Sequence, residues 1–132
     1  MEEKIVLTEE QQRLLDKQGW FYEYKEVDKP LADIATRGMR ENLNHEDLQI
    51  VLAIGKEMAE LILDTVIANI KDGYKYREGL WNNVIEDTVV EFKRVRSGDR
   101  SLLRLVLPDS EGRFPEDEGC QYPYCEQYKA ID

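Results

Sequence analysis

The longest hydrophobic pattern in the chain runs from Asn44 to Gly73 and has the spacing of a helix. Asn44 is a favourable N-cap residue, and Gly73 suits the left-handed position that follows many helices. Between these two ends, apolar residues recur at intervals of three and four, which places them on one side of a helix. They are Leu48, Val51, Leu52, Gly55, Met58, Ala59, Ile62, Val66 and Ile70. The pattern predicts one long helix that the rest of the chain packs around.

Further apolar positions widen this stripe beyond the roughly 100° that a surface helix needs. At about 1.5 Å per residue, the predicted helix would also be longer than a small domain is wide. We therefore expect it either to be wrapped by the rest of the chain or to pair with a second copy. Pairing would give a homodimer, because two-fold pairing of one self-complementary patch is the commonest form of assembly. The expected interface residues are Ile50, Ile54, Gly55, Met58 and Leu61.

Residues 1–43 contain two shorter helical patterns separated by an aromatic segment. Thr8 and Gln11 are spaced as a capping-box pair, which predicts a helix over residues 9–17. Residues 20–27 begin with an aromatic cluster and favour a strand, with a helix as the alternative. Residues 31–39 have apolar positions at helical spacing, and we expect this helix to form an antiparallel hairpin with the long one.

The hydrophobic period changes to two within residues 86–108, which predicts a β-hairpin. Residues 98–99 are Gly-Asp and fit a two-residue hairpin loop of the type that places glycine first. A loop of this length sets Phe92 opposite Leu105. The face expected to lie on the long helix then carries Val90, Phe92, Leu103, Leu105 and Leu107.

Together these elements predict a single α+β domain over residues 1–132. The long central helix, 44–73, would be covered by the shorter N-terminal helical part and by the antiparallel β-hairpin packed on it. Residues 109–132 form an acidic, turn-rich tail. Because aromatic residues return near its end, we expect this tail to dock on the domain.

Composition narrows the classes of function. The chain has 42% hydrophobic residues, enough for a core, and a formal net charge of −10. Such a charge repels anionic polymers, so we expect no direct nucleic-acid binding and no binding to membranes. The N-terminus lacks the basic and apolar regions of a signal peptide, which predicts a cytoplasmic protein with reduced cysteines. No motif calls for a cofactor, and we expect none.

Cys120 and Cys125 have the spacing of one half of a zinc site. A single chain offers only His45 as a further soft ligand, so a conventional site would need two chains. A pair of reduced structural thiols is the alternative. His45 lies at the predicted start of the long helix, where it is badly placed to assist a nucleophile, and no glycine-rich phosphate loop is present.

Glu57, Glu60 and Asp64 would lie along one side of the long helix, and carboxylates are the ligands that magnesium prefers. The residues Glu57-Met58-Ala59-Glu60 resemble half of the ExxE…ExxD pattern of the all-α nucleotide pyrophosphohydrolases related to MazG. The resemblance implies a magnesium-dependent nucleotide hydrolase, although no ExxD pair follows on a second predicted helix. A solvated polar stripe on an apolar helix is the alternative.

The β-hairpin carries the main cluster of basic residues in this acidic chain. Arginine side chains suit phosphate and carboxylate groups, so the cluster is a candidate site for a nucleotide or another small anion, with tyrosines of the tail beside it. The alternative is cross-strand pairing with acidic neighbours, in which each exposed pair contributes little. The candidate ligand-binding residues are Lys93, Arg94, Arg96, Arg104, Tyr122 and Tyr124.

The stretch from Leu105 to Tyr124 resembles small uncharacterised proteins of bacterial phages and prophages. The resemblance implies a non-enzymatic accessory protein or inhibitor. We therefore predict a small acidic binding protein that acts on a macromolecular partner, most simply a protein. The alternatives are a module that sequesters a nucleotide or small anion, and the magnesium-dependent hydrolase.

Overall fold

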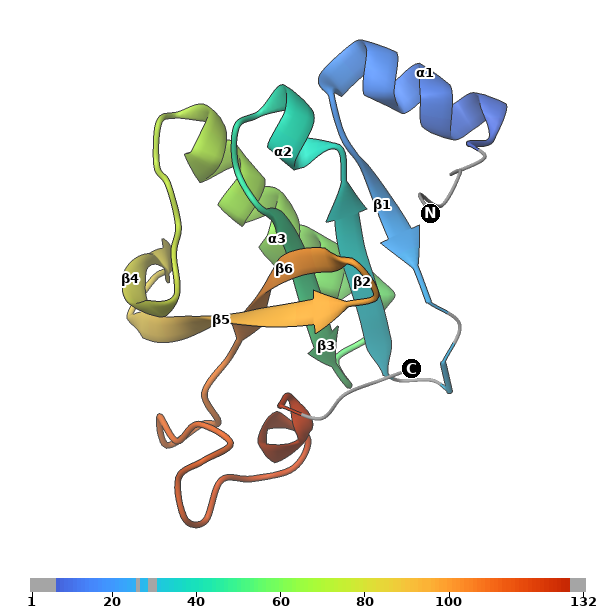
Figure 1. The fold of residues 1–132 in the computed structure, drawn as a ribbon. Coiled ribbons are helices and arrows are strands. Elements are labelled where there is room, and N and C mark those ends of the chain that lie inside the picture. The colour runs from blue at the N-terminus through green and yellow to red at the C-terminus, as the bar shows by residue number, and fades with distance from the viewer. Residues whose placement is uncertain (1–6, 26, 29–30, 129–132) are drawn as a thin grey trace.

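The centre of the structure is a six-stranded mixed sheet with the strand order β1-β2-β3-β6-β5-β4 (Figure 1). The computed structural model describes residues 7–25, 27–28 and 31–128. Neighbouring strands are antiparallel except β3 and β6, which run parallel. The strands are β1 (Phe21–Tyr24), β2 (Ala32–Arg37), β3 (Asp47–Leu52), β4 (Gly79–Ile85), β5 (Thr88–Ser97) and β6 (Arg100–Val106). The helices are α1 (Glu9–Gln18), α2 (Met39–Asn42), α3 (Lys56–Lys71) and the short 3₁₀ helix η1 (Tyr124–Glu126).

The predicted long helix over residues 44–73 is wrong, and the architecture is built on a sheet instead. Residues 47–52 form β3 and residues 56–71 form α3, with Gly55 (φ +85°) between them. The run from Leu48 to Leu52 is buried on both faces of the sheet and is apolar except at Gln49, so apolar and polar positions do not alternate strictly. Consecutive apolar positions also satisfy a spacing of three and four, and periodicity alone therefore favoured a helix.

The predicted helix over residues 31–39 is also wrong, and with it the expected antiparallel pair of helices. Residues 32–37 form β2, which pairs with β1 on one side and with β3 on the other. Ile34 faces Tyr24 in β1 and Ile50 in β3. Because two neighbouring strands pair with the backbone of this segment, the tertiary context outweighs its local helical pattern.

Predictions that depend on adjacent residues are confirmed. Thr8 caps α1, and its contacts with Gln11 are the reciprocal hydrogen bonds of a capping box, both 3.0 Å long. Of the strand predicted over residues 20–27, Phe21–Tyr24 form β1, and residue 26 lies outside the described residues. In the hairpin of β5 and β6, Phe92 pairs with Leu105, as the two-residue loop predicted.

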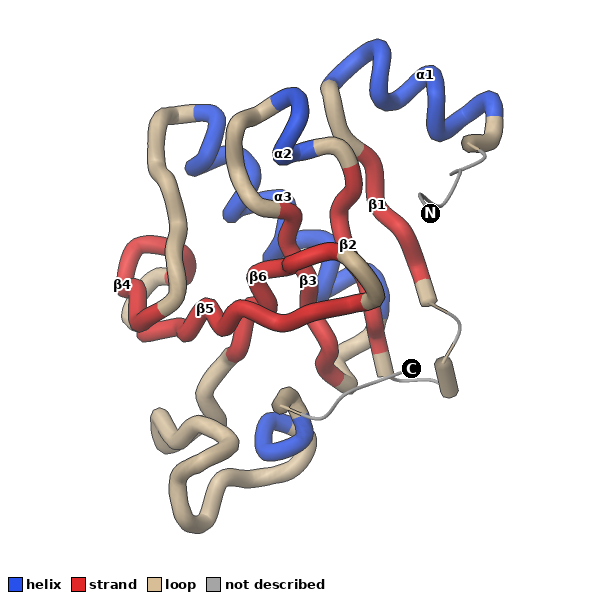
Figure 2. Tube along the Cα trace, viewed as in Figure 1, coloured by secondary structure: helices blue, strands red, loops and turns tan. Residues whose placement is uncertain are grey.

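The main hydrophobic core lies between α3 and one face of the sheet (Figure 2). Helix α3 contributes the buried residues Ala59, Leu63, Val66, Ile67 and Ile70. They form one cluster with alternate residues of the strands, which include Ile34, Leu48, Ile50, Phe92, Leu103 and Leu105. Full burial of one large apolar side chain contributes about 1.5–3 kcal/mol, so this layer ties α3 firmly to the sheet. Among the described residues, no helix is long and apolar enough to span a bilayer.

On the opposite face of the sheet, a chain of buried polar contacts holds the C-terminal segment. Arg104 donates from Nε to the side-chain oxygen of Gln49 and from Nη1 to the backbone oxygen of Gln127, each at 3.0 Å. The Gln127 side chain in turn bonds both backbone groups of Leu107, at 2.8 and 2.6 Å. The described part of the tail therefore docks on the sheet, as the sequence predicted.

The connection from β2 to β3, which includes α2, is anchored by a tight backbone contact. Gly38 (φ +102°) comes directly before α2, and a Cβ atom there would lie 2.7 Å from the backbone oxygen of Gly19. A larger residue at position 38 would have to adopt a strained positive φ, and its Cβ atom would clash with this backbone oxygen. Asn42, at the end of α2, donates from its amide to the same Gly19 oxygen at 3.0 Å. The end of α1 thus fixes the position of α2.

Candidate functional site

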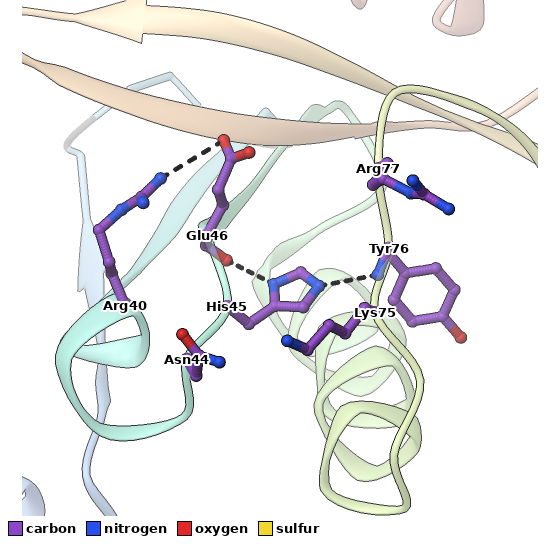
Figure 3. Close-up of a pocket in the computed structure, with 7 residues that line it drawn as sticks. All are labelled: Arg40, Asn44, His45, Glu46, Lys75, Tyr76 and Arg77. Atoms are coloured by element: carbon purple, nitrogen blue, oxygen red, sulfur yellow. Dashed lines mark hydrogen bonds and ion pairs between the residues drawn. The ribbon is translucent and has the colours of Figure 1, made fainter.

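A pocket of about 450 Å³ lies where the β2–β3 connection meets the α3–β4 connection (Figure 3). The residues that line it are Arg40, Asn44, His45, Glu46, Lys75, Tyr76 and Arg77. The first four belong to α2 and the loop before β3, and the last three belong to the segment after α3. The pocket therefore exists only because two segments that are distant in the sequence come together.

His45 joins these two segments. Its Nε2 atom accepts a hydrogen bond from the backbone N–H of Tyr76 at 2.9 Å, and its Nδ1 atom lies 2.8 Å from the backbone oxygen of Glu46. A backbone N–H can only donate and a carbonyl can only accept, so Nε2 is the acceptor and Nδ1 carries the proton. The side chain is buried, and both ring nitrogens are engaged by backbone. His45 is therefore placed as a structural clamp and not as a general base.

The segment after α3 is held at several backbone positions. Gly73 (φ +111°) follows the helix, and the N–H of Tyr74 bonds the backbone oxygen of Asn69 at 3.1 Å. Two residues on, the N–H of Tyr76 bonds His45. The indole N–H of Trp81 then bonds the backbone oxygen of Arg77 at 2.9 Å. These anchors hold the backbone on which the exposed side chains of this segment are carried.

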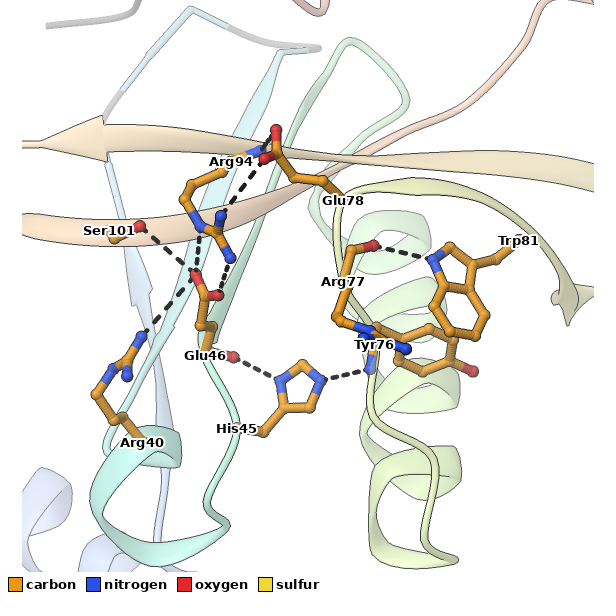
Figure 4. A network of polar contacts seen from close by, with 9 residues as sticks. All are labelled: Arg40, His45, Glu46, Tyr76, Arg77, Glu78, Trp81, Arg94 and Ser101. Atoms are coloured by element: carbon orange, nitrogen blue, oxygen red, sulfur yellow. Dashed lines mark hydrogen bonds and ion pairs between the residues drawn. The ribbon is translucent and has the colours of Figure 1, made fainter.

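The Glu46 carboxylate at the wall of the pocket is paired with an arginine (Figure 4). Arg94 of β5 donates to it through two nitrogens, with distances of 2.5 and 3.2 Å. Arg40 lies 3.9 Å and the Ser101 hydroxyl 3.5 Å from the same carboxylate. The hydrogen bonds from Arg94 hold the pKa of Glu46 below its ordinary value, although burial acts in the opposite direction. Glu46 thus stays ionised, with its charge offset by the Arg94 fork.

The remaining charges of the pocket are cationic. Arg40, Lys75 and Arg77 are exposed, and Figure 3 shows Lys75 extending past His45 towards Asn44. The Arg77 guanidinium extends from the same segment in the other direction. Among the described residues, no carboxylate forms an ion pair with Lys75 or Arg77. With Glu46 offset by Arg94, the pocket carries net positive charge in a protein of net charge −10.

A second hollow, of about 580 Å³, lies between α1, α2 and the loop of the β5–β6 hairpin. Its charged lining residues are Arg37, Arg40, Arg100, Glu41, Asp47 and Asp99. Arg37 and Arg100 both pair with Glu23, at 2.9 and 2.8 Å, and Arg100 lies 3.3 Å from Asp47. Positive and negative charges balance in this hollow, so it offers less driving force for a charged ligand than the first pocket.

The predicted ligand-binding residues of the hairpin do not form one site. Arg94 is engaged by Glu46 and, at 3.4 Å, by Glu78. Lys93 projects from the other face of β5 and lies 4.9 Å from the centre of the Tyr128 ring. The other predicted residues are dispersed: Arg96 is exposed near the hairpin loop, Arg104 is buried against Gln49 and Gln127, Tyr122 is 72% exposed in the tail, and Tyr124 begins η1.

The predicted metal ligands fall into two separate places. Glu57 is exposed on α3, whereas Glu60 accepts a hydrogen bond from Tyr24 at 2.8 Å and Asp64 accepts one from Tyr22. Burial and the carboxylate beside it raise the pKa of each tyrosine, so both hydroxyls stay protonated donors. Cys120 and Cys125 are free thiols in the C-terminal segment. In the part of the chain that the structure describes, no three residues of these types are grouped as metal ligands.

The residues expected at a dimer interface do not share a surface. Ile50 is fully buried in β3, and Ile54 packs against the core. Gly55 precedes α3, and on that helix Met58 and Leu61 are 51% and 61% exposed. The long helix on which all five were expected to lie does not exist.

Sequence analysis missed the three cations of the pocket. Arg40 was placed between two predicted helices, and the segment 74–77 was regarded only as a connection. A usable signal was present, because Tyr74-Lys75-Tyr76-Arg77 alternates aromatic and basic residues directly after a helix end. Comparison of the chain with protein-family models, with curated proteins and with solved structures gives no match.

Proposed function

We propose that this protein is a non-catalytic binding protein that captures an anionic ligand in the pocket of Arg40, Lys75 and Arg77. The proposal takes up the alternative of an anion-binding module in place of the expected binding to a macromolecular partner, and it transfers the anion site from the hairpin to this pocket. In the hairpin, Arg94 is engaged by Glu46 and Arg104 by backbone and amide groups.

The observation that carries the proposal is the local excess of positive charge. Two exposed cations, Lys75 and Arg77, stand on a backbone that His45 and Trp81 hold in place. A fixed backbone lowers the ordering cost that the protein pays when a ligand binds. In a chain of net charge −10, such a cluster attracts anions to one place while the remaining surface repels them.

Neither the histidine nor the carboxylate that lines the pocket is available as a base, which supports a binding role over a hydrolytic one. His45 is the single histidine of the chain, and both of its ring nitrogens are engaged by backbone groups. The Glu46 carboxylate is held by Arg94 with a lowered pKa, which makes it a weak proton acceptor.

The test is isothermal titration calorimetry with pyrophosphate, in a chelator-containing buffer of low ionic strength. We expect saturable binding to the wild-type protein, which weakens as salt is added because exposed charges are screened. Lys75→Gln should weaken binding about tenfold, as expected for loss of one charge-assisted contact. Lys17→Gln, at an exposed lysine of α1, is the matched control and should leave the affinity unchanged.

Two results would overturn the proposal. One is the absence of any binding of pyrophosphate at millimolar concentration. The other is an equal loss of affinity in Lys75→Gln and Lys17→Gln, because it would show that the overall charge and not the pocket decides binding.

A further inference from the structure

A ladder of aromatic rings leads from the core to the surface beside the cationic pocket. The Tyr76 ring packs against Trp81 and Phe92, with ring centres 4.9 Å apart in each case. On its outer side, Tyr74 lies nearly parallel to Tyr76, with an angle of 15° between the ring planes and 6.2 Å between their centres. Tyr76 is buried, but Tyr74 is 49% exposed. The ladder therefore ends in an aromatic ring that is open to solvent.

This outer ring is well supported for stacking. The backbone of Tyr74 is bonded to the last turn of α3, and its ring rests on Tyr76, which is itself fixed by Asn69 at the hydroxyl (2.9 Å) and by His45 at the backbone (2.9 Å). A ring in this position loses little conformational freedom when a second planar group stacks on it.

The aromatic ring and the cations belong to the same short segment. Lys75 follows Tyr74 directly, and Arg77 comes two residues later. The one acidic side chain next to Arg77, Glu78, accepts a hydrogen bond from the backbone N–H of Arg94 at 3.1 Å and so turns towards β5. Figure 3 shows the Arg77 guanidinium on the side of the segment where the Tyr76 ring lies, and Tyr74 stacks on that ring. A ligand that carries a flat ring and a negatively charged group can therefore place the ring on Tyr74 and the charge at Arg77.

From this juxtaposition we infer that the ligand of the pocket is a nucleotide, with its phosphates at Arg77 and its base stacked on Tyr74. The inference rests on the proposed anion-binding function and names the class of ligand. Bases stack on tyrosine rings with little sequence preference, because every base has a π-face. A mononucleotide fits better than a nucleic-acid chain, since a polymer would bring many phosphates against a protein of net charge −10.

The test compares ADP with pyrophosphate, two ligands with similar phosphate groups of which only one has a base. Calorimetry with chelator present should give tighter binding for ADP, by about 5- to 150-fold, which is the range for one stacked base. Tyr74→Leu keeps an apolar cover on Tyr76 but removes the aromatic face. This variant should bind ADP no better than pyrophosphate, while its affinity for pyrophosphate stays at the wild-type value.

Tyr122→Leu is the matched control, because Tyr122 is an exposed tyrosine (72%) of the distant tail. It should retain the preference for ADP, and circular dichroism should show that both variants are folded. If neither ligand binds, the proposed function fails. If pyrophosphate binds and ADP binds no tighter, the anion pocket stands and the nucleotide inference is wrong. Tighter binding of an eight-residue oligothymidylate than of ADP would also overturn it, in favour of single-stranded nucleic acid.

Discussion

At the residue scale, Asp109 shows how one carboxylate organises a loop. One of its oxygens accepts the backbone N–H groups of Glu111 and Arg113, both at 2.9 Å. The other accepts Nε of Arg113 and the backbone N–H of Gln121, both at 3.0 Å. Burial by itself would raise the pKa of Asp109, but these hydrogen bonds to the charged form outweigh it and lower the pKa to about 2.

The lowered pKa predicts a specific loss of stability in acid. The folded-state pKa of Asp109, about 2, lies below its ordinary value of 3.8. Its contribution to stability is therefore complete above about pH 4 and is lost as the pH falls from about 4 to 2. Asp109→Asn should be less stable than wild type at pH 7, and this difference should shrink over that interval. Chemical denaturation at a series of pH values measures the difference, and a constant difference down to pH 2 would contradict the assignment.

At the scale of elements, the β5–β6 hairpin and α3 bury one shared apolar layer. Phe92 is 1% exposed, contacts the Tyr76 ring and pairs with Leu105 across the hairpin. Leu105 is fully buried in the same cluster as α3. The hairpin loop therefore fixes which residues of β5 meet the helix.

We expect Phe92→Ala to lower the free energy of unfolding by about 3–5 kcal/mol, as truncation of a buried phenylalanine does. Val89→Ala, at a 42% exposed position of the same strand, is the control and should cost less than about 1 kcal/mol. Urea denaturation of the two variants measures both values. A loss below 1 kcal/mol in Phe92→Ala would mean that the register of the hairpin differs from the one described.

At the scale of the whole molecule, the sheet removes the reason for a dimer along a long helix. That expectation depended on an apolar strip too wide for one chain to cover, and the sheet covers most of it by placing β3 between β2 and β6. Of the five expected interface residues, Met58 and Leu61 are the large apolar side chains left exposed. Stable interfaces bury about 1,200–2,000 Å² in total, far more than these two residues provide.

We therefore expect light scattering at micromolar concentration to give the mass of a monomer. Leu61→Glu should leave that mass unchanged, as should Leu80→Glu, a matched change at a 64% exposed leucine of β4. A dimer mass that Leu61→Glu alone reduces would restore α3 as an interface.

The sequence by itself determined those parts of the fold that depend on contacts between residues close together in the chain. The capping box of Thr8 and Gln11 starts α1, and the two-residue loop before Arg100 sets the register of β5 and β6. In both cases the groups that bond are a few residues apart, so local geometry suffices.

Tertiary structure decided the secondary structure of those segments that are buried by residues distant in the sequence. Residues 47–52 and 32–37 form strands because each is flanked by other strands. Strand β3 is buried on both faces, so its apolar and polar positions do not alternate strictly. The candidate site depends on the same kind of contact, because Arg40 and Lys75 line one pocket where the His45 ring bonds the backbone of Tyr76. Residue types and their spacing along the chain do not predict the contact between His45 and Tyr76, because that contact results from how α3 and the sheet pack.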